Sequence, residues 1–379
     1  MTKALLKKLP NPKPILKWIK SNAVLFIALV AAIITSFIVR PDEKYIEYFD
    51  FKTLSCLFCV LAVVCALRNI GFFYTMAREI VRRFKNAKVA VLALVYITFI
   101  GSMLIANDMA LLTFLPLGYF ILHTTNKEKY LAFTFIMQNI AANLGGMLTP
   151  FGNPQNLYLY SKFNIPDGEF VSIMLPPFLI SIALITLCCL IFVKNEKLEI
   201  KEEAVNIPMG RVVIYLILFA LSIMIVFRFM HFLVGLIIIP IALLFLDRKA
   251  LLQVDYSLLF TFVFFFIFAG NMGRIDAVSD FFSYLLNINT LVFSALSCQV
   301  ISNVPSAILL SQFTDNYREL LLGVNIGGAG TLIASLASLI TFKNYMKRDP
   351  DHIGSYMLKF SLFNFGFLII LTLFCLIIK

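Results

Sequence analysis

The sequence has little charge for its length. Only 14% of its 379 residues are Asp, Glu, Lys or Arg, whereas 60% are hydrophobic and 39 are Phe. A soluble domain is about a quarter charged and under half apolar, so this composition excludes a soluble enzyme and a disordered or fibrous protein. Acids are the scarcer charge, and the net charge of +11 could suggest a nucleic-acid partner. In a membrane protein, however, basic residues report orientation, and we expect no nucleic acid.

Patterns typical of metal sites and disulfides are also missing. The three histidines are far apart, and none belongs to an HExxH motif or to the Cys/His spacing of a zinc site. The seven cysteines, an odd number, all fall inside apolar runs, which indicates packing rather than a disulfide framework. We therefore expect no structural metal and no cofactor.

Long apolar runs are abundant instead. Charge-free stretches of about 18 residues recur along the chain, and each can cross a ~30 Å hydrocarbon core as a helix. The sequence therefore predicts an all-α polytopic membrane protein. Residues 89–122 and 281–314 are too long for one crossing, and each run contains a polar break, Asn107-Asp108 or Ser302-Asn303. We interpret residues 89–122 and 288–314 as re-entrant hairpins, which enter and leave the membrane on one side.

The basic residues give the orientation of this topology. With both hairpins re-entrant, 24 of the 32 Lys and Arg residues fall in cytoplasmic segments and 8 in external ones, as the positive-inside rule requires. The prediction is nine full crossings with the N-terminus in the cytoplasm. The first hairpin opens from the cytoplasm and the second from outside. We expect the plasma membrane, that is, the cytoplasmic membrane of a bacterium, as the location.

An internal repeat is the most informative feature. Residues 143–157 align without gaps to residues 325–339, with Asn, Gly, Gly, Thr and Leu at identical spacing. A hairpin break that contains an Asn lies upstream of each copy. Because the predicted topology places the two copies in opposite orientations, we predict inverted repeats. Each consists of an interfacial helix, a re-entrant hairpin, a helix broken at a Gly-rich turn and a final span.

The predicted domain organisation follows from these segments. It consists of a basic N-terminal segment with a first scaffold helix (1–50), a first repeat (51–193), a cytoplasmic linker (194–211) and a second repeat (212–378). After its scaffold helix, the first repeat has an interfacial helix (68–85), the hairpin (89–122), a broken helix (130–161) and a span (170–193). The second has scaffold helices (212–246), a span (256–273), an interfacial helix (274–286), the hairpin (288–314), a broken helix (320–342) and a span (359–378).

A helix that breaks at bilayer depth is useful for transport. Its free N–H groups can hold an anion, and its free carbonyls can coordinate Na⁺. Asn and Thr side chains add neutral oxygen ligands, and glycines let the backbone approach a ligand. The predicted cation-binding and coupling residues are Asp108, Asn143, Gly145, Asn325 and Gly327, with Na⁺ as the metal ion. The predicted substrate-binding residues are Asn107, Thr149, Asn153, Ser302, Asn303, Gly328 and Thr331.

Asp108 is the only acid or base that this topology places near the midplane. Intramembrane carboxylates are rare and usually face a cavity, so we expect Asp108 to bind the coupling ion. An Asn-Asp pair at a helix start could instead cap that helix. The Gly-Gly pairs could likewise serve only close helix packing. The sequence leaves both alternatives open.

At these residues the chain resembles the ion transporter superfamily, in the branch of citrate-transporter-like permeases, arsenite permeases and sodium/proton antiporters. The motifs that carry the resemblance lie at residues 106–116, 143–157, 301–310 and 323–338. The resemblance implies a homodimer whose scaffold helices hold transport domains that move by an elevator-type mechanism. In dicarboxylate carriers of this group, paired Ser-Asn-Thr tips bind carboxylates and sodium. Here the tips are residues 106–108 and 302–304, and the Thr is lost from both.

The sequence therefore predicts a secondary active transporter, not an enzyme, that carries a small inorganic or organic anion in symport with Na⁺ or H⁺. No Lys or Arg is placed near the two tips, so an anion would depend on helix N-termini and a co-bound cation. Two alternatives stay open. One is a Na⁺/H⁺ antiporter that uses Asp108. The other is an arsenite efflux permease, for which Cys298 is the hint of a soft ligand, although packing explains this cysteine better.

Overall fold

The computed structural model describes residues 22–198 and 207–378. Within these ranges the chain is helical, and the only β-type pairing is an isolated bridge between Asn86 and Lys197. Eight helical segments of the described chain are long and apolar enough to cross a membrane. The predicted all-α membrane fold is therefore confirmed. The basic residues before position 22 and residues 199–206 of the expected linker lie outside the described residues.

The helices follow one another with short connections. The first half consists of α3 (Ala23–Ile38), η2 (Glu43–Tyr48), α4 (Phe51–Asn69), α5 (Phe72–Arg82), α6 (Ala87–Ile105), α7 (Asn107–Thr124), η3 (Glu128–Tyr130), α8 (Leu131–Gly145), η4 (Gly146–Leu148), α9 (Pro154–Lys162) and α10 (Asp167–Phe192). The second half consists of α11 (Met209–Val226), α12 (Phe232–Leu246), α13 (Arg248–Leu252), α14 (Tyr256–Gly273), α15 (Asp276–Ile301), α16 (Asn303–Leu310), α17 (Tyr317–Ile326), α18 (Leu336–Met346), η5 (Pro350–His352) and α19 (Ile353–Ile377).

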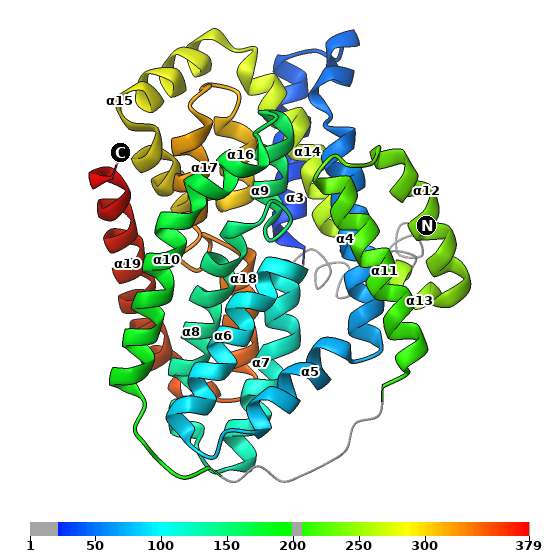
Figure 1. Cartoon of the computed structure of the whole chain (residues 1–379). Helices are drawn as coiled ribbons and strands as arrows, with labels where there is room; N and C mark the ends of the chain where they lie inside the picture. The colour runs from blue at the N-terminus through cyan, green and yellow to red at the C-terminus, as the bar shows by residue number, and fades with distance from the viewer. Residues whose placement is uncertain (1–21, 199–206, 379) are drawn as a thin grey trace, which may run out of the picture.

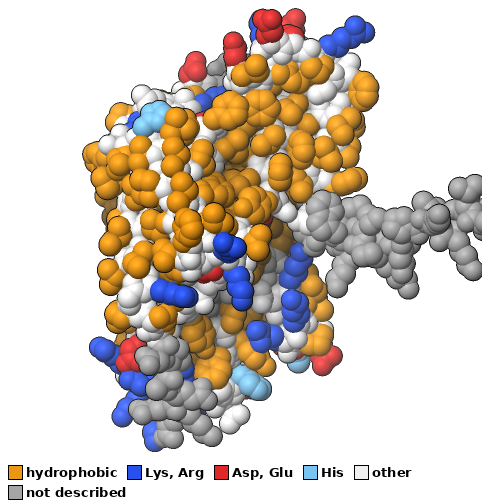
Figure 2. Space-filling view, turned by 90° about the vertical axis from the view of Figure 1, so that its right-hand side faces the viewer, with side chains coloured by type: hydrophobic (Ala, Val, Ile, Leu, Met, Phe, Trp, Pro, Cys, Tyr) orange, Lys and Arg blue, Asp and Glu red, His pale blue; other side chains and the backbone are white. Residues whose placement is uncertain are grey.

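The surface is apolar over most of its height. Figure 2 shows apolar side chains over much of one face, with acidic side chains at the top and basic side chains over the lower half. The helices differ in how much of their length lies inside the protein. Of an apolar 18-residue stretch within residues 128–148, 83% is buried, whereas 28% of such a stretch in α10 is buried. The first segment is therefore surrounded by other helices, whereas α10 presents a long face to the surroundings.

The helices form two groups that are recognisable by their packing. In the scaffold group, α3 packs on α14, and α4 packs on α11 and α12. The core group contains α6–α10 and α15–α19, which pack on one another. In Figure 1 the core group occupies the left and centre, and α4, α11 and α12 lie to the right. The two groups meet mainly where α14 contacts α16 and where α4 contacts α9.

Both polar breaks are tips of helical hairpins. Ala106, between α6 and α7, has φ 67° and ψ 153°, and Ser302, between α15 and α16, has φ 74° and ψ 159°. A positive φ is uncommon for a residue other than glycine, so the two tips share the same unusual backbone conformation. The α6–α7 hairpin lies in the lower half of Figure 1, and α16 lies in the upper half. α15 runs from the interfacial helix predicted at residues 274–286 into the predicted hairpin (288–314), and Asn289, the second residue of that hairpin, interrupts its helical dihedral angles.

Both Gly-rich segments interrupt a helix. The first break separates α8 from α9, which begins after Asn153 with a proline in its first turn, where a missing N–H does no harm. The second break separates α17 from α18, which begins after Ser335. Each hairpin packs against the far half of the opposite broken helix, since α7 contacts α18 and α16 contacts α9. The two halves of the chain therefore interlock at the centre of the core group.

Candidate functional site

Buried asparagines meet where the hairpin tips and the helix breaks converge. We call these residues the amide cluster: Asn107, Asn143, Asn153, Asn156, Asn303 and Asn325. Each is at most 4% exposed. A buried amide destabilises the fold unless its polar atoms are hydrogen-bonded. The hydrogen bonds of the cluster therefore define how the site is held.

The first hairpin tip is linked to the second helix break. Asn107 Oδ1 accepts a hydrogen bond of 2.9 Å from the backbone N–H of Asp108, and Asn107 Nδ2 donates to Asn143 Oδ1 at 3.2 Å. Asn143 Nδ2 in turn donates to Ser335 Oγ at 3.1 Å. Because Ser335 precedes α18, this chain of side chains crosses from the first half of the molecule to the second.

The second hairpin tip repeats the local geometry of the first. Asn303 Oδ1 accepts from the backbone N–H of Val304, again at 2.9 Å. The backbone N–H of Asn303 donates to the carbonyl of Ala334 at 3.0 Å, which ties the tip to the second break. A Cβ on Gly328 would lie 3.2 Å from Asn303 Nδ2 and 3.6 Å from Asn143 Oδ1. A larger residue at position 328 would therefore crowd the amide of Asn303.

Asn325 occupies the position that matches Asn143 and makes a similar cross-contact. Its Oδ1 accepts from Asn153 Nδ2 at 3.2 Å and from Gln155 Nε2 at 3.4 Å. Its Nδ2 donates to Asn156 Oδ1 at 2.6 Å. Asn153 and Ser335 are aligned positions of the internal repeat, so each half sends an asparagine to the start of the opposite half-helix.

Thr149 and Thr331 have equivalent partners. Thr149 Oγ1 donates to the carbonyl of Met103 at 2.7 Å, and Thr331 Oγ1 donates to the carbonyl of Gln299 at 3.0 Å. Both acceptors lie three residues before a hairpin tip. These hydroxyl protons therefore fasten each helix break to its own hairpin, while the oxygen lone pairs stay available for a ligand.

Gly145 and Gly327 lie against the first helix of their own hairpin. A Cβ on Gly145 would overlap the carbonyl of Phe99 and lie 2.7 Å from Ser102 Oγ. A Cβ on Gly327 would lie 2.8 Å from Cys298 Sγ. Close helix packing, the alternative that the sequence left open, is therefore one function of these glycines. Cys298 fills this contact, which agrees with a packing role for its thiol.

Asp108 does not cap α7 with its side chain. The residue before α7 is Ala106, and the helix start has no side-chain cap hydrogen bond. Asp108 Oδ1 is buried and has no hydrogen-bond partner among the described residues. Asn153 Oδ1 and Gln155 Oε1 share this condition. An unpaired buried acceptor is unfavourable, and at the carboxylate of Asp108 a proton or a cation would satisfy it.

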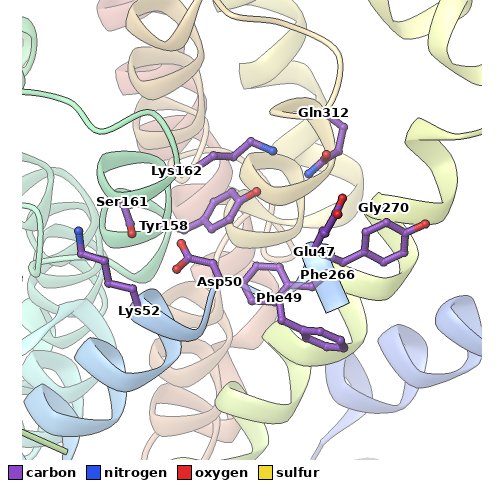
Figure 3. Close-up of a pocket in the computed structure, with 11 residues that line it drawn as sticks. Glu47, Phe49, Asp50, Lys52, Tyr158, Ser161, Lys162, Phe266, Gly270 and Gln312 are labelled. Carbon is purple, nitrogen blue, oxygen red and sulfur yellow. The ribbon is translucent and has the colours of Figure 1, made fainter. Parts of the chain in front are cut away.

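A cavity of about 420 Å³ lies at the boundary between the two helix groups. Its wall includes residues from η2 and the start of α4, from α9 of the core group and from α14. Figure 3 shows Lys162, Tyr158 and Gln312 converging on one side, with Glu47 and Asp50 among the other lining residues. This cavity holds charges of both signs, unlike the amide cluster.

The sequence did not single out several residues that the structure brings into the site. They are Gln155, Asn156, Gln299 and Ser335. Ser335 could have been found, because it aligns with Asn153 in the internal repeat. Asn156 also lies in the aligned segment, but Gln299 lies outside it and was visible only as a polar residue in an apolar run.

Comparison with known proteins assigns the chain to a family. The model of the citrate transporter family matches residues 14–316. The chain belongs to this citrate transporter family. It is 32% identical to an uncharacterized transporter of Methanocaldococcus jannaschii over 337 residues, which cover 88% of this chain and 92% of that protein. The inner membrane protein YbiR of Escherichia coli is 27% identical over 341 residues, which cover 87% of this chain and 90% of that protein.

Two further similarities concern part of the chain or its fold. The silicon efflux transporter LSI3 of rice, Oryza sativa, is 27% identical over 168 residues, which cover 43% of this chain and 34% of that protein. The YdaH transporter of Alcanivorax borkumensis, described as having an unusual topology, superposes with a TM-score of 0.52 at 12% identity. The match covers 96% of this chain and 98% of that one. The citrate-transporter-family protein is therefore a multi-pass membrane transporter with this fold.

Proposed function

We propose that this member of the citrate transporter family is a secondary active transporter of a small anion, driven by a gradient of H⁺ or Na⁺. The observation that carries the proposal is the convergence of two matched hairpin tips on buried amides. Each tip begins a helix, α7 with 18 residues and α16 with 8 residues. The positive ends of two helix dipoles and the amide N–H groups together favour a bound anion.

The donors of the site indicate a weakly charged substrate. The hydrogen-bond partners of Asn107 and Asn303 are amides, hydroxyls and backbone groups rather than Lys or Arg, within the described parts of the chain. The hydroxyl that Thr would supply at each tip is replaced by Asp108 and Val304. A small monovalent anion therefore suits these donors better than a tricarboxylate, which would bring three charges into a site without a fixed cation.

Asp108 supplies the coupling in this proposal. Its unpartnered, buried Oδ1 lies at the start of α7, one residue from Asn107. Binding of a cation or proton there removes a negative charge beside the anion site, so that the two ligands favour each other's binding. The flux of the anion is thereby linked to the ion gradient.

Alternating access in this proposal is of the elevator type. The core group carries the hairpins and helix breaks of both inverted repeats, and the scaffold group stays fixed within a homodimer in the plasma membrane, with the N-terminus in the cytoplasm. The separate packing of the two groups supports this division. A contact between them that must change is Arg228, which donates to the carbonyl of Tyr160 at 2.7 Å and lies over its ring. The basic lower half of Figure 2 supports the cytoplasmic assignment of that end.

Uptake into proteoliposomes tests the proposal. Purified protein is reconstituted, and the uptake of labelled lactate, succinate, citrate and phosphate is measured under an imposed H⁺ or Na⁺ gradient. Saturable uptake that collapses when an ionophore dissipates the gradient supports the carrier. Uptake that rises linearly with concentration identifies a channel instead. The absence of flux for every anion under both gradients contradicts the proposal.

Efflux of a small neutral oxyacid is a second candidate. It is favoured by the neutral amide donors of the site and by the rice relative, whose name describes silicon efflux. Arsenite and silicic acid are uncharged near neutral pH and would need no countercharge. Their efflux from loaded vesicles, with no anion uptake, would replace the anion carrier. Na⁺-induced proton movement in vesicles free of any anion would instead identify a Na⁺/H⁺ antiporter.

A further inference from the structure

An amide side chain donates hydrogen bonds to the carbonyl oxygens of the first helix break. From α9, Asn156 Nδ2 lies 3.2, 3.1 and 3.2 Å from three carbonyl oxygens of the break, those of Gly146, Met147 and Thr149. Asn156 is fully buried, and its Oδ1 accepts from Asn325 Nδ2 at 2.6 Å. This acceptor bond fixes which end of the amide carries the two N–H groups. The nitrogen is therefore surrounded by carbonyl oxygens.

A second amide closes the other helix break from a different element. Gln299 Nε2, on α15, donates to the carbonyls of Gly327 at 2.8 Å and Ala329 at 3.4 Å, and to Ala295 on its own helix at 3.0 Å. Its Oε1 accepts from the backbone N–H of Thr331 at 2.9 Å, which again fixes the orientation of the amide. Gly330 has φ 139°, and a Cβ there would overlap Gln299 Oε1, so the break is shaped around this side chain.

The two amides are not copies of one ancestral residue. The position that matches Asn156 in the second half is Ser338, and the position that matches Gln299 in the first hairpin is Met103. Neither counterpart can present an amide nitrogen to carbonyls. Each half therefore reaches the same arrangement, one N–H₂ group facing three carbonyl oxygens, by a different route.

This arrangement occupies the place where a broken helix would coordinate a metal cation. Half-helix carbonyls hold Na⁺ in transporters because their partial negative charges converge on one point. Here that point carries a nitrogen whose hydrogens are positive and already satisfy the carbonyls. A cation would have to displace a buried amide and leave it unpaired, which is strongly unfavourable. Asn325 Oδ1 is equally unsuited as a ligand, since two amide N–H donors use both of its lone pairs.

We propose that Asn156 and Gln299 act as built-in substitutes for metal cations, so that neither helix break binds Na⁺ and the transporter rejects Na⁺ as its coupling ion. The inference rests on the proposed function and selects H⁺ rather than Na⁺ as the coupling ion. It concerns specificity rather than catalysis: the amides exclude one ion and do not contact the substrate.

Isosteric carboxylate variants test this directly. Gln299→Glu and Asn156→Asp each replace the N–H₂ group by an oxygen that faces carbonyls, which makes a cation necessary for stability. The control is Asn271→Asp, because Asn271 is a fully buried scaffold amide whose Nδ2 donates to the hydroxyls of Thr35 and Ser36 rather than to carbonyls. Thermal unfolding of full-length protein in detergent is measured in NaCl and in KCl at equal ionic strength.

The proposal expects the wild type and Asn271→Asp to unfold at the same temperature in both salts. Gln299→Glu and Asn156→Asp should unfold at a temperature about 2 °C or more higher in NaCl than in KCl, because Na⁺ binds only their folded state. If one carboxylate variant does not fold, the other alone tests the proposal. If neither folds, the wild type tests it, by its unfolding temperature in NaCl and KCl and by its uptake of substrate under a Na⁺ gradient alone.

Three results would overturn the proposal. They are a Na⁺-specific rise in the unfolding temperature of the wild type, uptake of substrate driven by Na⁺ alone, and folded carboxylate variants that do not distinguish Na⁺ from K⁺. The proposed function fails by a different result, the absence of anion flux under any gradient, and the unfolding assay does not depend on that outcome. The two failures are therefore distinguishable.

Discussion

Asn143 donates a hydrogen bond of 3.1 Å to Ser335, although 192 residues separate them in the chain. The matching bond joins Asn153 to Asn325 at 3.2 Å across 172 residues. Each helix break is thus anchored on the other half of the molecule. The candidate site exists only when both halves have folded together, which explains why its polar residues are so deeply buried.

The bond between Asn143 and Ser335 should be visible in a double-mutant cycle. Asn143→Ala leaves the buried Nδ2 of Asn107 without its acceptor, and the free energy of unfolding should fall by about 1–3 kcal/mol. Ser335→Ala should lower the free energy of unfolding less in the Asn143→Ala variant than in the wild type, and the difference, the coupling energy, should be about 0.5–3 kcal/mol. Denaturation in detergent measures the cycle. Additive effects of the two substitutions on the free energy of unfolding would show that the bond contributes nothing. A separate measurement, the ion activation of transport by Asn143→Ala, tests the cation role predicted for Asn143.

Asp108→Asn keeps the size of the side chain but removes its charge. We expect transport to lose its dependence on the ion gradient, because the proton or cation no longer has a carboxylate to bind. Expression and unfolding temperature should stay near those of the wild type. Counterflow of substrate in vesicles without an ion gradient separates the outcomes. Continued exchange places Asp108 on the coupling ion, whereas unchanged gradient-driven uptake would exclude any coupling role for this residue.

Thr149→Val and Thr331→Val each remove a hydroxyl donor but keep the β-branched shape. The carbonyls of Met103 and Gln299 then lose a partner, and each substitution should destabilise the protein by about 1–3 kcal/mol. Thr149→Ser and Thr331→Ser retain the hydroxyl and serve as controls. If the Val variants keep full stability but bind substrate more weakly, the hydroxyls act as substrate ligands, as the sequence predicts, rather than as fasteners of the hairpins.

Glu196 should make stability depend on acidic pH. Hydrogen bonds from Lys127, Lys129 and Tyr130 lower the pKa of this carboxyl from 4.5 to about 2 in the folded protein. Its contribution is therefore complete above pH 4.5 and is lost as the pH falls toward 2. Glu196→Gln should lower the unfolding temperature at neutral pH, and the difference from the wild type should shrink in acid. A difference that does not vary with pH would contradict this assignment.

Single cysteines at Lys85 and Lys127 test the membrane path of the first hairpin. These positions lie on either side of α6 and α7, and a hairpin places both on the cytoplasmic side. A membrane-impermeant thiol reagent should therefore label both only in inside-out vesicles, and a cysteine at Arg318 only in right-side-out vesicles. The seven native thiols, six of them buried, are replaced beforehand. Labelling of Lys85 and Lys127 from opposite sides would show a full crossing and remove the basis for inverted repeats.

Local features were enough to find the membrane-spanning runs, the two hairpin tips and the two helix breaks. Apolar length sets where a helix can span, and the polar pairs at 107–108 and 302–303 interrupt such runs wherever they occur. Asn107 and Asn303 were named because they stand at these tips, and Asn143 and Asn325 because they match in the internal repeat and offer neutral oxygen ligands. The interfacial helix predicted at residues 68–85 was longer than α5, since α4 continues to Asn69 before Gly71 turns the chain.

Only the tertiary structure decided which polar atoms meet. A gapless alignment shows that Asn153 and Ser335 are equivalent, but it carries no information that Asn153 bonds Asn325 while Asn143 bonds Ser335. Those partners depend on how the two halves interlock, which arises from packing between segments more than 150 residues apart. The same holds for Gln299, whose amide reaches a helix break from another element. Hydrogen bonds require distance and direction together, and the sequence specifies the groups while the fold alone sets their positions.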